Sequence, residues 1–160
     1  MTTRILAGTL VAVIASVGFS WATPGSGTSS VLVGRATFDA FKVKRKAMGG
    51  DWKVKIEAKP DLDVAVQTIA FPAGSHSGWH SHPGPVFIAV VEGTMTFYDS
   101  EDPNCQPVVR QAGEGFLDTG EHAHIARNES GQPAKNVVTY FAPAGAPLRR
   151  DEPAPAHCPF

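Results

Sequence analysis

Residues 74–93 read GSHSGWHSHPGPVFIAVVEG and decide the fold class. Three histidines fall within seven residues, at positions 76, 80 and 82, and an apolar run from Val86 to Val91 follows them. Residues two apart in a β-strand point to the same face of the sheet, so His80 and His82 can reach one metal ion. Because a metal site generally takes three or more protein ligands, we expect further ligands from another part of the chain.

The rest of the chain also alternates between short strands and turns. Apolar or alternating runs at 31–41, 51–58, 63–71, 94–100 and 136–143 are separated by segments rich in Gly, Pro, Asn and Asp. No segment keeps the 3.6-residue period of a helix. Short strands at this spacing are typical of sandwiches and barrels, so we predict an all-β fold.

The two ends of the chain differ from its middle. Residues 1–22 contain one positive residue, Arg4, then an apolar run, then small residues at Ser20 and Ala22, which is the plan of a secretory signal peptide. The run is shorter than the roughly 20 residues of a spanning helix, so we expect cleavage after Ala22, a secreted protein and no stable membrane insertion. A flexible linker at 23–30, a β-barrel at 31–144 and an extended Pro-rich tail at 145–160 complete the predicted organisation.

Charge and cysteine content bear on partners and compartment. With 14 basic and 15 acidic residues the net charge is −1, which gives no reason to expect nucleic acid or an anionic membrane as a partner. The lysines of 42–59 alternate with apolar residues and indicate a solvated strand face. In an oxidising compartment, Cys105 and Cys158 favour one disulfide that pins the tail, over two free thiols or a zinc site.

Five of the six histidines fall in two clusters, at 76–82 and 122–124, and each cluster contains His-x-His. If the two strands that carry these pairs face each other, four rings converge. The pattern therefore predicts a transition-metal site. Imidazole ligands suit Zn, Cu, Fe and Ni without choosing among them. The candidate divalent metals are therefore Fe, Ni, Cu and Zn, with Mn as a further candidate.

The spacing of the clusters resembles the two motifs of cupins, which are small jelly-roll β-barrels. The first motif, G-x5-H-x-H-x3-E-x6-G, matches at Gly74, His80, His82 and Gly93, with Val86 in the place of the glutamate. The second, G-x5-P-x-G-x2-H-x3-N, matches at Gly113, His124 and Asn128, with Thr119 and Glu121 replacing its proline and glycine. The resemblance covers residues 64–142 and implies a single jelly-roll barrel.

The same resemblance implies a ligand set. Cupins hold a metal with three histidines and one glutamate, so His80, His82 and His124 are the ligands implied here and the carboxylate is missing at Val86. The fourth position is open to water, substrate or another protein group, with His122 the first candidate and His76 the second. Because a histidine must be neutral to bind a metal, we expect affinity to fall below about pH 6.5.

Candidate residues around the site are mostly aromatic. The pocket-wall candidates are Trp79, Phe87, Phe97, Phe116, Tyr140 and Phe141, although most of them also suit an ordinary barrel core. Asn128 suits the turn of the second motif better than contact with a substrate. Dimers formed through outer strands are common in cupins, which makes residues 52–58 the candidate surface for a homodimer.

Two function classes stay open. Some cupin-type dioxygenases hold Fe(II) with three histidines and no glutamate, which implies a dioxygenase-like oxidoreductase acting on a small organic molecule. The missing glutamate and the extra histidines fit instead a non-catalytic module that binds a metal or a small ligand. A cupin isomerase or epimerase is a weaker third class, because no base or set of sugar-reading residues can be identified. Open coordination positions favour catalysis and closed ones favour a structural role.

Overall fold

The structure is a computed structural model that describes residues 22–47 and 49–160. The predicted signal peptide therefore lies outside the described residues, except for Ala22. Nowhere in the described part does a helix reach the length and apolarity needed to cross a membrane.

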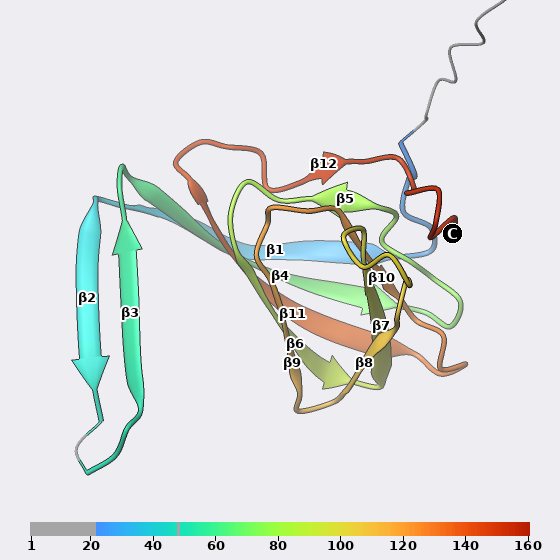
Figure 1. The fold of residues 1–160 in the computed structure, drawn as a ribbon, viewed down its shortest axis with the longest axis horizontal. Coiled ribbons are helices and arrows are strands. Elements are labelled where there is room, and N and C mark those ends of the chain that lie inside the picture. The colour runs from blue at the N-terminus through green and yellow to red at the C-terminus, as the bar shows by residue number, and fades with distance from the viewer. Residues whose placement is uncertain (1–21, 48) are drawn as a thin grey trace, which may run out of the picture.

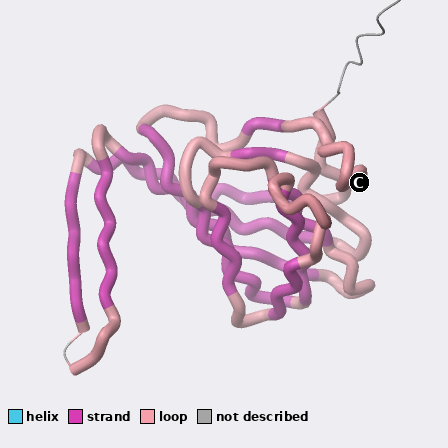
Figure 2. Tube along the Cα trace, viewed as in Figure 1, coloured by secondary structure: helices cyan, strands magenta, loops and turns pink. Residues whose placement is uncertain are grey.

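The described part is built of strands, turns and loops, without a helix (Figure 2). The strands, in chain order, are β1 (Ser29–Phe38), β2 (Phe41–Lys46), β3 (Lys53–Ala58), β4 (Leu62–Phe71), β5 (His80–Ser81), β6 (Val86–Glu92), β7 (Thr94–Asp99), β8 (Val108–Gln111), β9 (Gly115–Asp118), β10 (His124–Arg127), β11 (Ala134–Pro143) and β12 (Arg150–Asp151).

Ten of these strands form two five-stranded antiparallel sheets (Figure 1). The first sheet has the order β1-β4-β11-β6-β9 and the second has the order β12-β5-β10-β7-β8. Apart from β7 and β8, neighbours in each sheet are not consecutive strands in the sequence, which is the pattern of a jelly roll. The predicted all-β jelly-roll fold is confirmed.

The core lies between the two sheets. Strand β6 shows how it forms, because Val86, Ile88 and Val90 are buried while Phe87 and Ala89 between them are exposed. These inward residues pack against Met95 and Phe97 of β7 and against residues of β4, β10 and β11. The sequence of β6 is almost entirely apolar and does not show which residues are buried. In the structure its side chains alternate between the buried and the exposed face.

Strands β2 and β3 form a separate hairpin that projects from the two sheets (Figure 1). Its register places Lys44 opposite Lys55 and Val43 opposite Ile56. The lysine side is solvated, as the alternation in the sequence indicates, and the apolar residues of the hairpin are also partly exposed.

Both chain segments outside the predicted barrel lie against it. In the segment expected to be a flexible linker, Ser26 exchanges two backbone hydrogen bonds with His76, at 2.8 and 3.0 Å. In the tail, β12 pairs with β5, and Cys158 forms the predicted disulfide with Cys105, with Cα atoms 5.6 Å apart. The tail covers a second apolar cluster made of Trp79, Tyr98, Ile125 and Cys158.

We expect removal of the disulfide to destabilise the protein strongly. The bridge closes a loop with a sequence separation of 53 residues, and chain entropy gives such a bridge about 4 kcal/mol. For a chain of this size that corresponds to a fall in Tm of about 8–16 °C in a Cys105→Ser/Cys158→Ser variant. Thermal unfolding followed by circular dichroism, with the reduced wild type as a control, checks this. A fall below about 2 °C would mean that the tail is held by its other contacts alone.

Candidate metal centre

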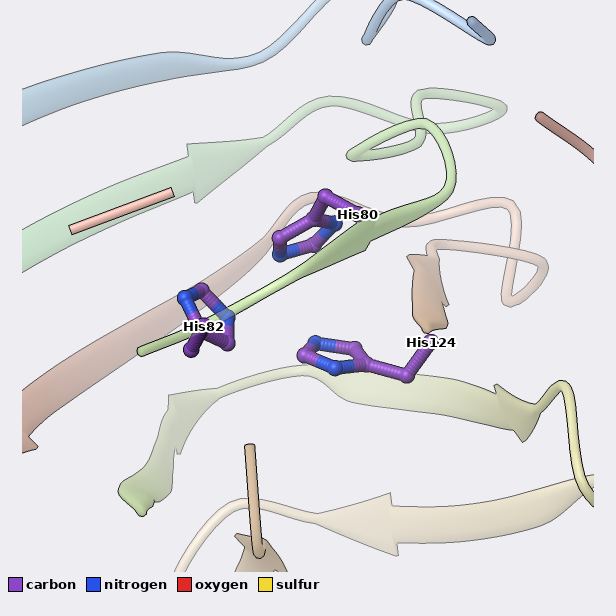
Figure 3. A group of neighbouring side chains, drawn as sticks. All are labelled: His80, His82 and His124. Atoms are coloured by element: carbon purple, nitrogen blue, oxygen red, sulfur yellow. The ribbon is translucent and has the colours of Figure 1, made fainter. Parts of the chain in front are cut away.

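Three buried histidines meet at one point, two of them on strands and one just after the end of a strand (Figure 3). His80 lies on β5 directly opposite His124 on β10, as a cross-strand pair, and His82 follows two residues after His80. The ring centroids are 4.4 Å apart for His80 and His124, 4.7 Å for His80 and His82, and 5.1 Å for His82 and His124. One nitrogen from each ring lies within 4.8 Å of the others, which is a separation that one metal ion can bridge.

The turn after His82 lies close to β11. An added Cβ at Gly84 would lie 2.2 Å from the carbonyl oxygen of Phe141, so only glycine fits this approach. Pro83 and Pro85 restrict the backbone on both sides of it. The stiff sequence HPGP therefore holds His82 in place where the short strand β5 has already ended.

Hydrogen bonds to backbone carbonyls set the proton positions on two of the rings. Nδ1 of His80 lies 2.8 Å from the Gly78 oxygen, and Nδ1 of His82 lies 2.6 Å from the Leu148 oxygen. A carbonyl oxygen can only accept, so each Nδ1 carries the proton and each Nε2 keeps a free lone pair. Neutral imidazoles oriented in this way are ready-made metal ligands.

Burial keeps these rings neutral. It lowers the pKa of His80 well below its ordinary value, and the neighbouring His124 and Arg149 act in the same direction. Burial also lowers the pKa of His82 to about 4. The expected loss of metal affinity near pH 6.5 is therefore wrong for these two ligands, because their unbound rings stay neutral to lower pH.

A buried carboxylate stands beside the group. Oδ2 of Asp118, at the end of β9, lies 3.1 Å from Nδ1 of His124 and 3.8 Å from Nε2 of His82. Burial raises the pKa of the Asp118 carboxyl, but the contact with His124 and a hydrogen bond from the Gly120 amide outweigh it and hold this pKa below its usual value. Asp118 is therefore ionised at neutral pH.

The three histidines form part of the wall of a cavity of about 220 Å³. Its polar side chains include Gln67, Asn136, Tyr140 and Arg149, and its apolar lining comes from Ile69, Phe71, Ile88 and Val138. The Tyr140 hydroxyl donates to Oε1 of Gln67 at 3.0 Å, and burial raises its pKa to about 12, so it stays protonated. Oδ1 of Asn136 is buried without a hydrogen-bond partner.

The structure does not bring the two other candidate ligands to the group. The His122 side chain is 40% exposed and faces Glu101 and Glu121, at 3.4 and 4.0 Å. Strand β10 begins only at His124, so His122 lies in the preceding turn, where residues two apart need not share a face. His76 pairs through its backbone with Ser26 and Arg127 and accepts from the Gly78 amide at Nδ1.

Most of the predicted pocket-wall residues lie elsewhere. Trp79 faces the opposite side of β5 from His80, in the cluster under the tail, where its Nε1 donates to the Phe160 oxygen at 2.7 Å. Phe97 and Phe116 stack on each other in the core, with centroids 4.3 Å apart, and Val86 is fully buried there. Among these aromatic candidates, Tyr140 lines the cavity.

Asn128 holds the turn that follows β10. Its amide nitrogen donates to the oxygens of Phe71 and Gln132 at 2.7 and 2.6 Å, and its oxygen accepts from Ser130. The residue is buried and does not line the cavity. It therefore supports the motif without touching a ligand.

Sequence reasoning missed several polar residues of the site, among them Gln67, Asp118, Asn136 and Arg149. Gln67 and Arg149 reach the cavity from β4 and from the tail, far from either motif. Asp118 ends a short apolar strand, GFLD, and that charged end was the one available signal. Its place beside the histidines depends on strand register, which the sequence does not display.

Comparison with known protein families identifies the central part of the chain. Residues 67–140 match the family model Cupin_2, described as a cupin domain. This chain carries a cupin domain. The match includes all three converging histidines, and the residues that precede it contribute β1, the hairpin and the first half of β4.

Several solved structures are similar to this chain at low identity. A double-stranded β-helix domain protein from Klebsiella pneumoniae has 15% identity over 71% of this chain and 84% of its own, with a TM-score of 0.47. A cupin superfamily protein from Desulfitobacterium hafniense has 8% identity over 66% and 82%, with a TM-score of 0.44. A DMSP lyase from Ruegeria pomeroyi has 18% identity over 54% and 42%, with a TM-score of 0.47. These similarities are too distant to transfer an activity, and no curated protein matches the chain.

The lowered histidine pKa values predict how the stability of the metal-free protein varies with pH. In the unfolded chain these rings titrate near pH 6.5, whereas in the folded chain His82 titrates near pH 4 and His80 well below its ordinary value. Between these limits the unfolded state binds more protons than the folded state. The free energy of unfolding is therefore highest above pH 6.5 and decreases as the pH falls toward 4.

Urea unfolding at a series of pH values measures this dependence. We expect the decrease between pH 6.5 and about 5, above the range in which exposed carboxylates titrate, to shrink in a His80→Asn/His82→Asn variant. A His122→Ala variant is the matched control, because that ring is partly exposed. A free energy of unfolding that stays level over this range in the wild type would contradict the assignment of neutral buried rings.

Proposed function

We propose that this protein is exported and binds one divalent transition metal through Nε2 of His80, His82 and His124, and that it acts as a dioxygenase-type oxidoreductase on a small organic substrate. The observation that carries the proposal is the arrangement of three buried rings, with at least two free Nε2 atoms, along the wall of a cavity. The donor set fits a divalent metal, because neutral imidazole suits Fe, Ni, Cu and Zn.

The cavity supports a role beyond metal storage. Neither His122 nor His76 belongs to the group of converging histidines, so a closed set of four imidazoles is not formed by the described residues. The cavity is smaller than the 300–1,000 Å³ typical of pockets for drug-sized ligands, which favours a small substrate. Arg149 also favours an anionic or chelating one, since its charge lies close enough to influence both His80 and His82.

The chain's own residues have distinct tasks in such a reaction. The bound metal supplies Lewis-acid and redox chemistry, and a dioxygenase places both atoms of O₂ in its product without an external reductant. Arg149 attracts and orients an anionic group, while its position is held by hydrogen bonds to Asp151 and to the Ser77 oxygen at 2.6 and 2.7 Å. The protonated Tyr140 hydroxyl is a neutral hydrogen-bonding group in the cavity wall.

A non-catalytic module that binds a metal or a small ligand is the second candidate. It is favoured by Val86, which leaves the position of the first motif's carboxylate apolar and fully buried. The two candidates share the metal site and differ in whether O₂ is consumed. Export is supported by the Cys105–Cys158 disulfide, since such bonds persist in oxidising compartments.

Metal content tests the shared part of the proposal. We expect the protein, purified from an exporting host, to contain about one equivalent of Fe, Mn, Ni, Cu or Zn by elemental analysis. A His80→Ala/His124→Ala variant is expected to lose it, because two of the three ligands are removed. A His122→Ala variant is the matched control and should keep the metal. Absence of metal in the wild type, even after reconstitution with each of these ions, would contradict the proposal.

Oxygen uptake then separates the two candidates. Diketones, phenols and thiols are suitable probes, and an active compound should take both oxygen atoms from ¹⁸O₂. We expect an Arg149→Ala variant to have a higher KM for an anionic probe. The variant lacks the guanidinium group that attracts the negative charge of the probe. A metal-loaded protein that consumes no O₂ with any of these classes would favour the non-catalytic module.

A further inference from the structure

Asp118 is a buried carboxylate to which neither cupin motif assigns a role. Its residue is 7% exposed, and it lies at the end of β9 with Oδ2 directed at the histidines. Removing a carboxylate from water is costly unless it is paired. Its neighbours at the Oδ2 end are the imidazoles of His124 and His82, so its surroundings are those of the metal centre.

Strand register explains why the carboxylate lies there. Asp118 of β9 is the cross-strand partner of Val86 of β6, so the two side chains lie on the same face of the sheet. Val86 occupies the position where the first motif has its glutamate. The chain thus lacks a carboxylate on one strand and carries one directly opposite, on the neighbouring strand.

Local packing holds the Asp118 side chain in place. Its Oδ1 accepts a hydrogen bond from the Gly120 amide at 3.1 Å. Gly120 has a φ of +84° and lies so close to Gly84 that an added Cβ would be 2.3 Å from the Gly84 oxygen. The turn after β9 and the turn after His82 are therefore packed against each other. Oδ2 is left as a buried atom without an aligned hydrogen bond, and so is Nδ1 of His124.

The three rings share one pattern. Nδ1 of His80 and Nδ1 of His82 both face hydrogen-bond acceptors, the oxygens of Gly78 and Leu148, which leaves their Nε2 atoms free. For the third ring, the acceptor beside Nδ1 is the Asp118 carboxylate, at 3.1 Å. A carboxylate that accepts from a ligating histidine fixes its tautomer and makes it a stronger donor to the metal.

We propose that Asp118 is the positioning residue of His124, holding that ring with the proton on Nδ1 so that all three Nε2 atoms face one metal ion. This inference rests on the proposed metal site. Direct ligation by Asp118 fits less well, because the set of side chains whose ligand atoms all lie within 4.8 Å of one another contains the histidines and not Asp118. Outside that set, the carboxylate places its negative charge beside His124, where it offsets part of the charge of the metal.

Two measurements on Asp118→Ala and Asp118→Asn test the role. The first is the Zn²⁺ affinity, measured by competition with a chromophoric chelator. We expect a loss of about 10–100-fold in Asp118→Ala, which is the usual effect of removing such a partner. A smaller loss is expected in Asp118→Asn, whose amide oxygen still accepts but without the charge. Asp63→Asn is the matched control, because Asp63 is also buried but contacts Arg35, Thr37 and Gly145 instead.

The second measurement is the tautomer of His124, from long-range ¹H–¹⁵N spectra of the metal-free protein at mildly alkaline pH. We expect the proton on Nδ1 in the wild type and in Asp63→Asn, and a mixture of tautomers in Asp118→Ala. A purely structural role for Asp118 would change the melting temperature of the variant without moving this proton. The same tautomer in the wild type and in Asp118→Ala would overturn the proposal.

Two further outcomes are decisive. If X-ray absorption of the metal-loaded protein shows one ligand fewer in Asp118→Ala than in the wild type, Asp118 binds the metal directly and the positioning role is overturned. If the wild type binds none of the metals, the proposed function fails. The tautomer of His124 in the metal-free protein then still decides whether Asp118 orients that ring.

Discussion

One cross-strand pair, His80 opposite His124, creates the site. The two residues are 44 positions apart in the chain and belong to different histidine clusters. Antiparallel pairing of β5 with β10 places both side chains on one face of the second sheet, and His82 reaches the same point from beyond the end of β5. If β10 shifted by one residue, Ile125 would replace His124 on that face and the group would be lost.

This pair is held from both sides of its sheet. On the inner side, the core between the two sheets fixes their spacing. On the outer side, β12 pairs with β5, and the tail beyond it packs on Trp79 and is tied to Cys105 by the disulfide. Because β5 has two residues only, its position depends on these contacts more than on its own hydrogen bonds. The Pro-rich tail is thereby linked to the geometry of the histidines, and it also carries Arg149 into the cavity wall.

The sequence predicted those features that depend on local pattern. Alternation and turn composition were sufficient for the all-β class, and motif spacing was sufficient for His80, His82 and His124. The two-residue spacing predicts that His122 shares a face with His124, and this fails because β10 begins at His124. The prediction of Trp79 as a pocket residue is wrong because Trp79 is adjacent to His80, and adjacent strand residues point to opposite faces. Asp118, Gln67 and Arg149 were missed because strand register and the course of the tail bring them to the site.

A single crystallographic experiment addresses the central claim, that three histidines hold one metal ion. Crystals of the metal-loaded protein, with data collected on both sides of the absorption edge of the bound metal, give an anomalous difference map of that element alone. If the three histidines hold the ion, one strong peak lies about 2.0–2.2 Å from Nε2 of His80, His82 and His124, next to the cavity. A peak at another place, or bonds to the Nδ1 atoms of His80 and His82, would contradict it.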